Sequence, residues 1–174
     1  AAMAEPARPV ACRPRAAAPS PMPPLMASVA LALADADTPV WLDRDLAAAP
    51  EVGRWLAFQT GASVVSDPSD AVFAFVVDAA AMKPLSAFST GTAEYPDRST
   101  TVIVGVDGFD LSAGPSFSGP GFDAPRRFAP LSAPSRLSAD LAANRLLFPR
   151  GVDLLFLADT ALAGLPRSVR LAAE

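Results

Sequence analysis

The segment Ser89-Thr90-Gly91-Thr92 is the polar stretch of this sequence with the clearest chemical potential. Adjacent hydroxyls beside a permissive glycine can present N–H and O–H donors to an anion such as a phosphate. The same residue types are also typical of a turn whose hydroxyls bond to their own backbone. Arg150 could complete an anion site, because a guanidinium matches the geometry of a phosphate group. Anion binding and turn formation are both open for this segment.

Four carboxylates, those of Asp35, Asp37, Asp43 and Asp45, cluster around Trp41 in the sequence. Oxygen ligands of this kind can bind Mg²⁺ or Ca²⁺. Their spacing does not fit an EF-hand, and aspartates beside proline and threonine are typical of turns and helix caps. We therefore predict turn and cap roles for these residues and no metal site.

Histidine is absent from all 174 residues, which excludes Ser-His-Asp and Cys-His catalysis and histidine metal sites. Cys12 is the only cysteine, so an intrachain disulfide or a cysteine metal cluster cannot form. A reducing, cytoplasmic setting is expected from this cysteine usage. Neither a base nor a second thiol accompanies Cys12, which argues against nucleophilic catalysis.

Lys83 is the only lysine and therefore the only residue that could form a Schiff base with pyridoxal phosphate. It precedes Pro84 in a polar-flanked segment without a glycine-rich phosphate cup, so we predict a solvated loop lysine and no cofactor. The run from Gly114 to Gly121 superficially resembles a phosphate loop. A Walker loop requires Gly-Lys-Ser/Thr opening a helix, whereas Gly119-Pro120-Gly121 predicts a turn.

Apolar periodicity predicts helices and buried strands that would position these residues. Helices are expected over residues 23–33, 51–60 (with Gly61 as its stop) and 135–147, the last burying Leu137, Leu141 and Leu147. Near-continuous apolar runs predict strands buried on both faces at residues 62–65 and 72–77, and further apolar segments predict strands at residues 40–42, 100–106 and 152–157.

Shorter apolar segments predict hairpins. Phe109–Leu111 is expected to begin a hairpin partner of strand 100–106, and a short strand is expected near Phe117. Residues 161–165 and 168–171 are expected to close an edge hairpin. Strands interleaved with amphipathic helices indicate an α/β fold, a three-layer sandwich with a mixed sheet, in one domain over residues 1–174.

Composition bears on partners and location. Apolar residues make up 51% of the chain, yet no apolar run approaches the roughly 18 residues that span a bilayer. The net charge of −4 argues against a general nucleic-acid binder. The N-terminus shows no secretory signal pattern. The apolar excess is either core or a surface that is hidden by a partner or by a second copy of the chain, and a single core to fill favours the hidden surface.

Several segments together resemble the PhnH family, a subunit of the bacterial carbon–phosphorus lyase system. The resembling blocks are Leu33 to Leu42, Ser89 to Thr92 followed by Pro96, Phe117 to Phe122, Phe148 to Leu155, and Leu165-Pro166-Arg167. They occur in family order. Ala2 to Pro6 looks like the end of the family's first helix, so we expect that this chain lacks preceding residues.

One departure from the family pattern concerns the backbone. The family has glycine after this Glu-Pro, where this chain has Ala7. The turn at Ala7 must therefore avoid positive φ or carry strain.

The resemblance implies a fold like the large domain of pyridoxal-phosphate transferases without the cofactor lysine. It implies self-pairing and association with the PhnG, PhnI and PhnJ subunits. That complex couples a phosphonate to the ribose of ATP, displacing adenine and forming ribose 1-phosphonate 5-triphosphate, and a radical S-adenosylmethionine subunit later breaks the C–P bond. No catalytic residue is carried over to this chain.

We predict a structural or assembly subunit of this complex, with a phosphonate- or nucleotide-binding module as the alternative. An independent pyridoxal-phosphate enzyme is disfavoured by the setting of Lys83. The residues expected at a ligand site or an interface are Trp41, Ser89, Thr90, Gly91, Thr92, Arg150 and Asp153.

Overall fold

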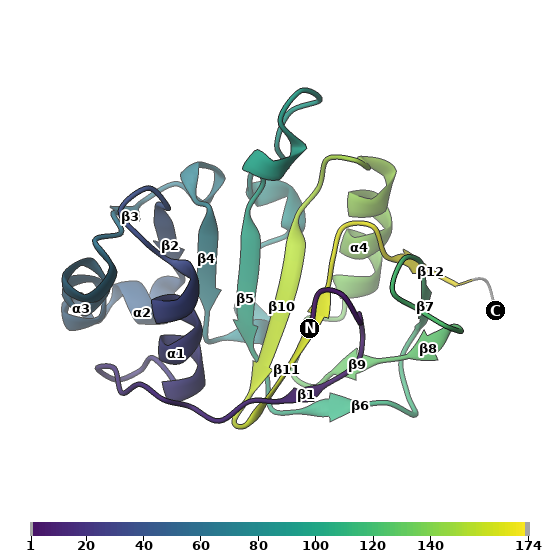
Figure 1. Ribbon diagram of the computed structural model, residues 1–174, viewed down its shortest axis with the longest axis horizontal. Helices are drawn as coiled ribbons and strands as arrows, with labels where there is room; N and C mark the ends of the chain where they lie inside the picture. Colours follow the sequence, from purple (N-terminus) through teal and green to yellow (C-terminus); the bar gives the residue numbers. More distant parts are fainter. Residues whose placement is uncertain (1, 173–174) are drawn as a thin grey trace.

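The computed structural model describes residues 2–172, and within this range a seven-stranded mixed sheet forms the centre of the molecule (Figure 1). The strand order is β1-β11-β10-β5-β4-β2-β3. These strands are β1 (Val10–Ala11), β2 (Val40–Leu42), β3 (Val64–Val65), β4 (Phe73–Val76), β5 (Thr101–Gly105), β10 (Asp153–Ala158) and β11 (Ala161–Leu165). Strands β10, β5, β4, β2 and β3 are parallel, whereas β11 and β1 pair antiparallel. The prediction of an α/β fold with a mixed sheet is confirmed.

Alternate residues of the central strands point to opposite faces of the sheet, and each face carries an apolar core. In β10, Leu154 and Phe156 belong to one core, and Leu155 and Leu157 belong to the other. The face of Leu155 is covered by α1 (Pro24–Leu33), α2 (Arg44–Ala47) and α3 (Pro50–Thr60). The other face is covered by α4 (Leu137–Leu146), by short 3-10 helices including η2 (Ala79–Ala81) and η3 (Leu85–Ala87), and by two small sheets. These layers fit a sandwich.

Local signals account for the helix boundaries. Pro24 and Pro50 occupy the first turns of α1 and α3, where a missing N–H costs nothing. Helix α3 ends at Gly61, which adopts the left-handed conformation with φ +78°. Helix α4 is shorter than predicted. Its Leu137 is buried as predicted, but Leu141 and Leu147 are only half-buried, and Leu147 lies beyond the end of the helix.

Both predicted hairpins are wrong in their partners. Strand β5 is flanked by β4 and β10 and has no free edge, so β6 (Phe109–Asp110) pairs instead with β9 (Ala129–Pro130). Strand β11 lies between β10 and β1, so β12 (Arg170–Leu171) pairs with β7 (Ser116–Ser118). Strand β7 also pairs with β8 (Arg126–Arg127).

The first described residues, at positions 2–4, form turns. Ala7 is fully buried with φ +57°, and its N–H donates to the Gly164 carbonyl over 2.9 Å. Of the two alternatives for this turn, the chain adopts the strained one, at a cost of about 1–2 kcal/mol. Gly164 also lets residues 2 and 3 lie close against β11, because a Cβ there would lie 2.8 Å from the Ala2 carbonyl oxygen.

Candidate functional site

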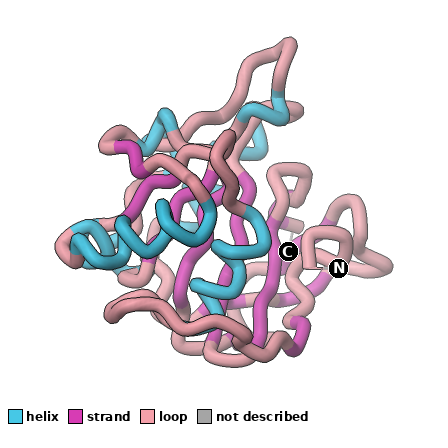
Figure 2. Tube along the Cα trace, turned by 60° about the vertical axis from the view of Figure 1, so that its left-hand side comes forward, coloured by secondary structure: helices cyan, strands magenta, loops and turns pink. Residues whose placement is uncertain are grey.

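The predicted polar segment lies in a loop that projects from the amino edge of the parallel strands. This projecting loop (residues 89–99) contains η4 (Pro96–Arg98) and leads directly into the start of β5. It rises above the sheet as the apex of the molecule in Figure 1 and again in Figure 2, which views the chain from another side. Thr90 and Ser99 pair across its base in an antiparallel bridge.

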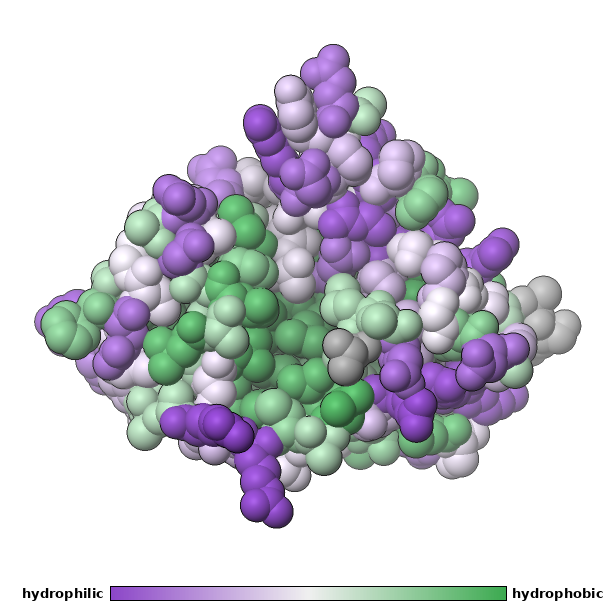
Figure 3. All heavy atoms as spheres, in the orientation of Figure 1, coloured by the Kyte–Doolittle hydropathy of each residue, from purple (hydrophilic) through white to green (hydrophobic). Residues whose placement is uncertain are grey.

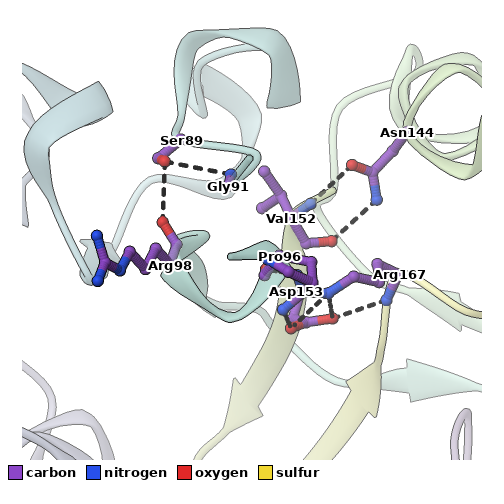
Figure 4. A network of polar contacts seen from close by, with 8 residues as sticks. All are labelled: Ser89, Gly91, Pro96, Arg98, Asn144, Val152, Asp153 and Arg167. Carbon is purple, nitrogen blue, oxygen red and sulfur yellow. Dashed lines mark hydrogen bonds and ion pairs between the residues drawn. The ribbon is translucent and has the colours of Figure 1, made fainter. Parts of the chain in front are cut away.

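Hydroxyl groups close the projecting loop on itself. The Ser89 Oγ donates to the Arg98 carbonyl over 3.1 Å and accepts from the Gly91 N–H over 3.4 Å (Figure 4). The Thr92 Oγ1 accepts from the Tyr95 N–H over 3.0 Å, and the Tyr95 carbonyl accepts from the Thr92 N–H over 3.1 Å. The hydroxyls of Ser89 and Thr92 therefore make the contacts of the turn alternative.

An ion pair anchors the loop to the sheet (Figure 4). The Arg167 Nε lies 3.2 Å from each carboxylate oxygen of Asp153, and the Arg167 backbone N–H donates to the same carboxylate over 2.7 Å. The Arg167 guanidinium also donates to the Pro96 carbonyl in the loop. Asp153 begins β10, so the pair joins the projecting loop to the middle of the sheet.

Asn144 of α4 supplies a second anchor beside the first. Its buried amide group donates to the Val152 carbonyl over 2.9 Å and accepts from the Val152 N–H over 2.8 Å (Figure 4). The neighbouring Gly151 N–H donates to the Thr90 carbonyl over 2.9 Å. Helix α4, the start of β10 and the projecting loop are thereby held in one arrangement.

The remaining predicted residues take different places. Arg150 is half-buried next to Gly151, and within residues 2–172 its side chain makes no hydrogen bond or ion pair. Trp41 is 8% exposed on β2, and its ring meets that of Phe88 edge to face at 5.8 Å. The structure therefore brings Ser89–Thr92 and Asp153 together, with Arg150 nearby, and places Trp41 in the core behind Phe88.

Sequence reasoning missed three residues of this network: Thr100, Asn144 and Arg167. The Thr100 hydroxyl is fully buried and donates to the Ala71 carbonyl over 2.7 Å. Asn144 carried a usable signal, because it falls on the same helical face as Leu137, seven residues earlier. Arg167 lies in one of the segments that resemble the family, but its partner Asp153 lies 14 residues away in the chain.

The polar network at the amino edge is a scaffold in which most polar groups bond to one another, although the buried Ser99 hydroxyl has no partner within residues 2–172. What it presents to the outside is the tip of the projecting loop. There the Tyr95 side chain is 47% exposed, and the Arg98 guanidinium lies 4.0 Å from the centroid of its ring. Arginine stacked on an exposed tyrosine is a pairing that suits a protein interface.

Two of the four aspartates around Trp41, Asp35 and Asp43, serve a turn and a cap as predicted, whereas Asp45 pairs with Arg44. The Asp35 carboxylate accepts from the Asp37 N–H over 3.0 Å. Asp43 is buried and caps α2 by accepting from the Leu46 N–H over 3.0 Å. No helix within residues 2–172 is long and apolar enough to cross a membrane.

An apolar hollow opens on the face of the sheet that α1 only partly covers, and it is the green depression in Figure 3. Its volume is about 530 Å³. The walls come from α1, β10, β11 and the segment after β1, and they include Val29, Leu33, Leu155 and Leu162. Arg13 and Arg15 stand at its rim, both exposed. Apolar side chains such as Leu31 and Leu33 are therefore exposed here, outside the two cores.

Comparisons with known proteins agree with the family resemblance. The model of the family described as "Bacterial phosphonate metabolism protein (PhnH)" matches residues 1–172. The chain is also 40% identical over 159 residues to the alpha-D-ribose 1-methylphosphonate 5-triphosphate synthase subunit PhnH of Rhizobium meliloti (strain 1021). That match covers 91% of this chain and 79% of the relative.

Proposed function

The chain belongs to the PhnH family of bacterial phosphonate metabolism proteins, and on that premise we propose that it is a subunit of a ribose 1-methylphosphonate 5-triphosphate synthase in carbon–phosphorus lyase metabolism. The family match over nearly the whole chain is the observation that carries this proposal. The proposed role is assembly within the cytoplasm, with PhnG, PhnI and PhnJ as partners and a homodimer in isolation. The proposed fold relationship is to the large domain of pyridoxal-phosphate transferases, in a single domain.

The projecting loop supports an assembly role. The hydroxyls of Ser89 and Thr92 and most of the loop's carbonyls are engaged inside the protein, and its base is anchored by Asp153, Arg167 and Gly151. A loop that is already ordered loses little conformational entropy when a partner binds it. We therefore propose Tyr95 and Arg98 as contacts to a partner subunit, with Ser89 to Thr92 and Asp153 as the residues that hold them in place.

The apolar hollow supports a partner for a different reason. Exposed apolar surface of this size is typical of interaction sites rather than of free protein surface. Leu31 and Leu33 of α1 are 40% and 41% exposed at this hollow. Burying them against another chain would remove apolar area from water, which favours association.

Co-expression of this chain with tagged PhnG, PhnI and PhnJ, followed by affinity purification, tests the assembly role. We expect the chain to co-purify at low salt, and its absence from the purified complex would refute the proposal. Tyr95→Ala together with Arg98→Ala should reduce recovery about tenfold, the loss typical of interface anchors. Phe58→Ala on α3 is the matched control, because Phe58 is an aromatic residue that is 87% exposed elsewhere on the surface.

A further inference from the structure

We propose a ligand site in the crevice at the carboxyl ends of β2 and β4, which takes a small organic molecule with a phosphate or phosphonate group. The site lies at the opposite edge of the sheet from the projecting loop and does not depend on the assembly role. Trp41 is the one predicted site residue that lines it.

The sheet topology places a crevice at this point. Strands β2 and β4 are adjacent and parallel. The chain leaving β2 enters α2 and α3, whose Leu46 and Val52 pack in the core on one face. The chain leaving β4 enters η2 and η3, whose Ala79 and Leu85 pack in the core on the other face. Adjacent parallel strands with connections to opposite faces open a crevice at their carboxyl ends, where α/β sheets bind ligands.

The crevice is a formed cavity. Its volume is about 440 Å³, within the range of about 300–1,000 Å³ that is typical of small-molecule sites. Trp41, Val65, Val76 and Met82 provide apolar walls. The mouth carries Arg44, Ser66 and Lys83.

Three carboxylates line the crevice: Asp45 pairs with Arg44, and those of Asp43 and Asp78 are engaged with the backbone. The Asp43 carboxylate accepts from the N–H groups of Leu46, Val77 and Asp78 over 3.0, 2.7 and 3.1 Å. It thereby ties the two chain segments that diverge from β2 and β4. The Asp78 carboxylate accepts from the Ala81 N–H over 3.3 Å. These carboxylates hold the walls together and are not free to bind a ligand.

Donor groups at the mouth are free by contrast. Within the described residues, Lys83 forms no ion pair or hydrogen bond, and its Nζ lies 5.9 Å from the centroid of the Trp41 ring. The Ser66 hydroxyl has no hydrogen-bond partner within residues 2–172 either. Arg44 uses its Nε for Asp45 at 3.1 Å, which leaves its terminal N–H groups available. Free donors above apolar walls favour an anionic head on a less polar body.

Fluorescence of Trp41 provides a direct readout once Trp55→Phe removes the other tryptophan of the chain. Methylphosphonate, inorganic phosphate and ATP are titrated separately into this variant at low ionic strength. We expect saturable quenching with at least one of them, weakened by salt because the contact is ionic. Tighter binding of methylphosphonate than of phosphate, which carries a similar charge, would indicate that the apolar walls hold the organic body. Equal binding of both would show an anion subsite alone and overturn the organic part of the proposal.

Charge-removing variants connect the signal to the crevice. Lys83→Gln and Arg44→Gln should each weaken binding about five- to tenfold, because each removes a charged donor. Arg127→Gln is the matched control, since Arg127 is an exposed arginine outside the crevice. The proposal fails if all three anions at millimolar concentration leave Trp41 unchanged, or if the three variants bind equally well. Co-purification with the other subunits is measured separately, so either proposal can fail without the other.

Discussion

Asp153 and Arg167 form a closed contact in which one carboxylate binds both the backbone N–H and the guanidinium of the same arginine. The contact joins the first residue of β10 to the segment that follows β11. The guanidinium extends it to the Pro96 carbonyl in the projecting loop. Both side chains are largely withdrawn from solvent, with exposed fractions of 18% for Arg167 and 13% for Asp153.

Asp153→Asn is expected to destabilise the protein. The amide keeps the shape and one acceptor but removes the charge that Arg167 faces, so the free energy of unfolding should fall by about 1–3 kcal/mol. Urea denaturation followed by circular dichroism measures this change. Glu5→Gln is the control, because Glu5 pairs with Arg8 at an exposed site and should cost less than about 0.5 kcal/mol. Equal effects of the two variants would contradict the anchoring role of Asp153.

Asn144→Ala is expected to lower the free energy of unfolding more than Asp153→Asn does. The variant leaves the N–H and the carbonyl of Val152 buried without partners, a loss of about 2–4 kcal/mol. The midpoint of thermal unfolding should fall accordingly. Arg145→Ala removes the next side chain of the same helix, which is half-buried and does not bond to Val152, and should change the midpoint little. If the midpoint of thermal unfolding fell no further than in Arg145→Ala, water would be bonding to the N–H and the carbonyl of Val152 in place of the amide.

Asp110 provides a prediction on pH. The Ser112 hydroxyl, together with the backbone N–H groups of Ser112 and Ala113, holds the pKa of the Asp110 carboxyl below its ordinary value of 3.8. A lowered pKa in the folded state means that these bonds stabilise the protein above pH 3.8 and are lost as the pH falls through the folded-state pKa.

Ser112→Ala should therefore raise the pKa of Asp110 toward 3.8, as measured by NMR titration of its carboxyl carbon. Asp67 is an internal control, because its pKa is lowered by the backbone N–H and the hydroxyl of Ser69 and should not move. An unchanged Asp110 titration in the variant would mean that the backbone N–H groups alone set its pKa.

The elements that the sequence predicted well are those with local causes. Prolines mark the starts of α1 and α3, and Gly61 ends α3 through its own conformation. The turn at Asp35 and the cap at Asp43 likewise depend on residues at most three positions away. Composition also predicted an apolar surface in excess of the core, although not its place beside α1.

The features that the sequence did not predict depend on contacts between residues far apart in the chain. A strand segment such as Phe109–Asp110 is visible from its residue types, but its partner depends on which sheet edges are already occupied. Arg167 could not be matched to Asp153 before β10 and β11 were known to lie side by side. The ligand crevice depends on the faces to which two connections run, which no single motif encodes.

Gly91→Ala tests whether the projecting loop is as ordered as its contacts indicate. Gly91 has φ +71°, and an added Cβ would lie 2.8 Å from the carbonyl oxygens of both Tyr95 and Pro96. The variant should destabilise the loop by about 1–3 kcal/mol, so the Thr92 and Tyr95 amides should exchange with solvent faster. Co-purification with partner subunits should weaken in parallel.

Gly53→Ala is the matched control for this substitution. Gly53 lies inside α3, and the nearest atom to an added Cβ there is a Val64 side-chain carbon at 3.7 Å. Alanine at this helical position should stabilise the protein by about 0.5–1 kcal/mol. The same chemical change is therefore expected to have opposite signs at the two positions. If the loop amides of Gly91→Ala exchanged at an unchanged rate, the loop would be able to accommodate a side chain at this position. That result would contradict the proposal that the loop is a preformed contact surface.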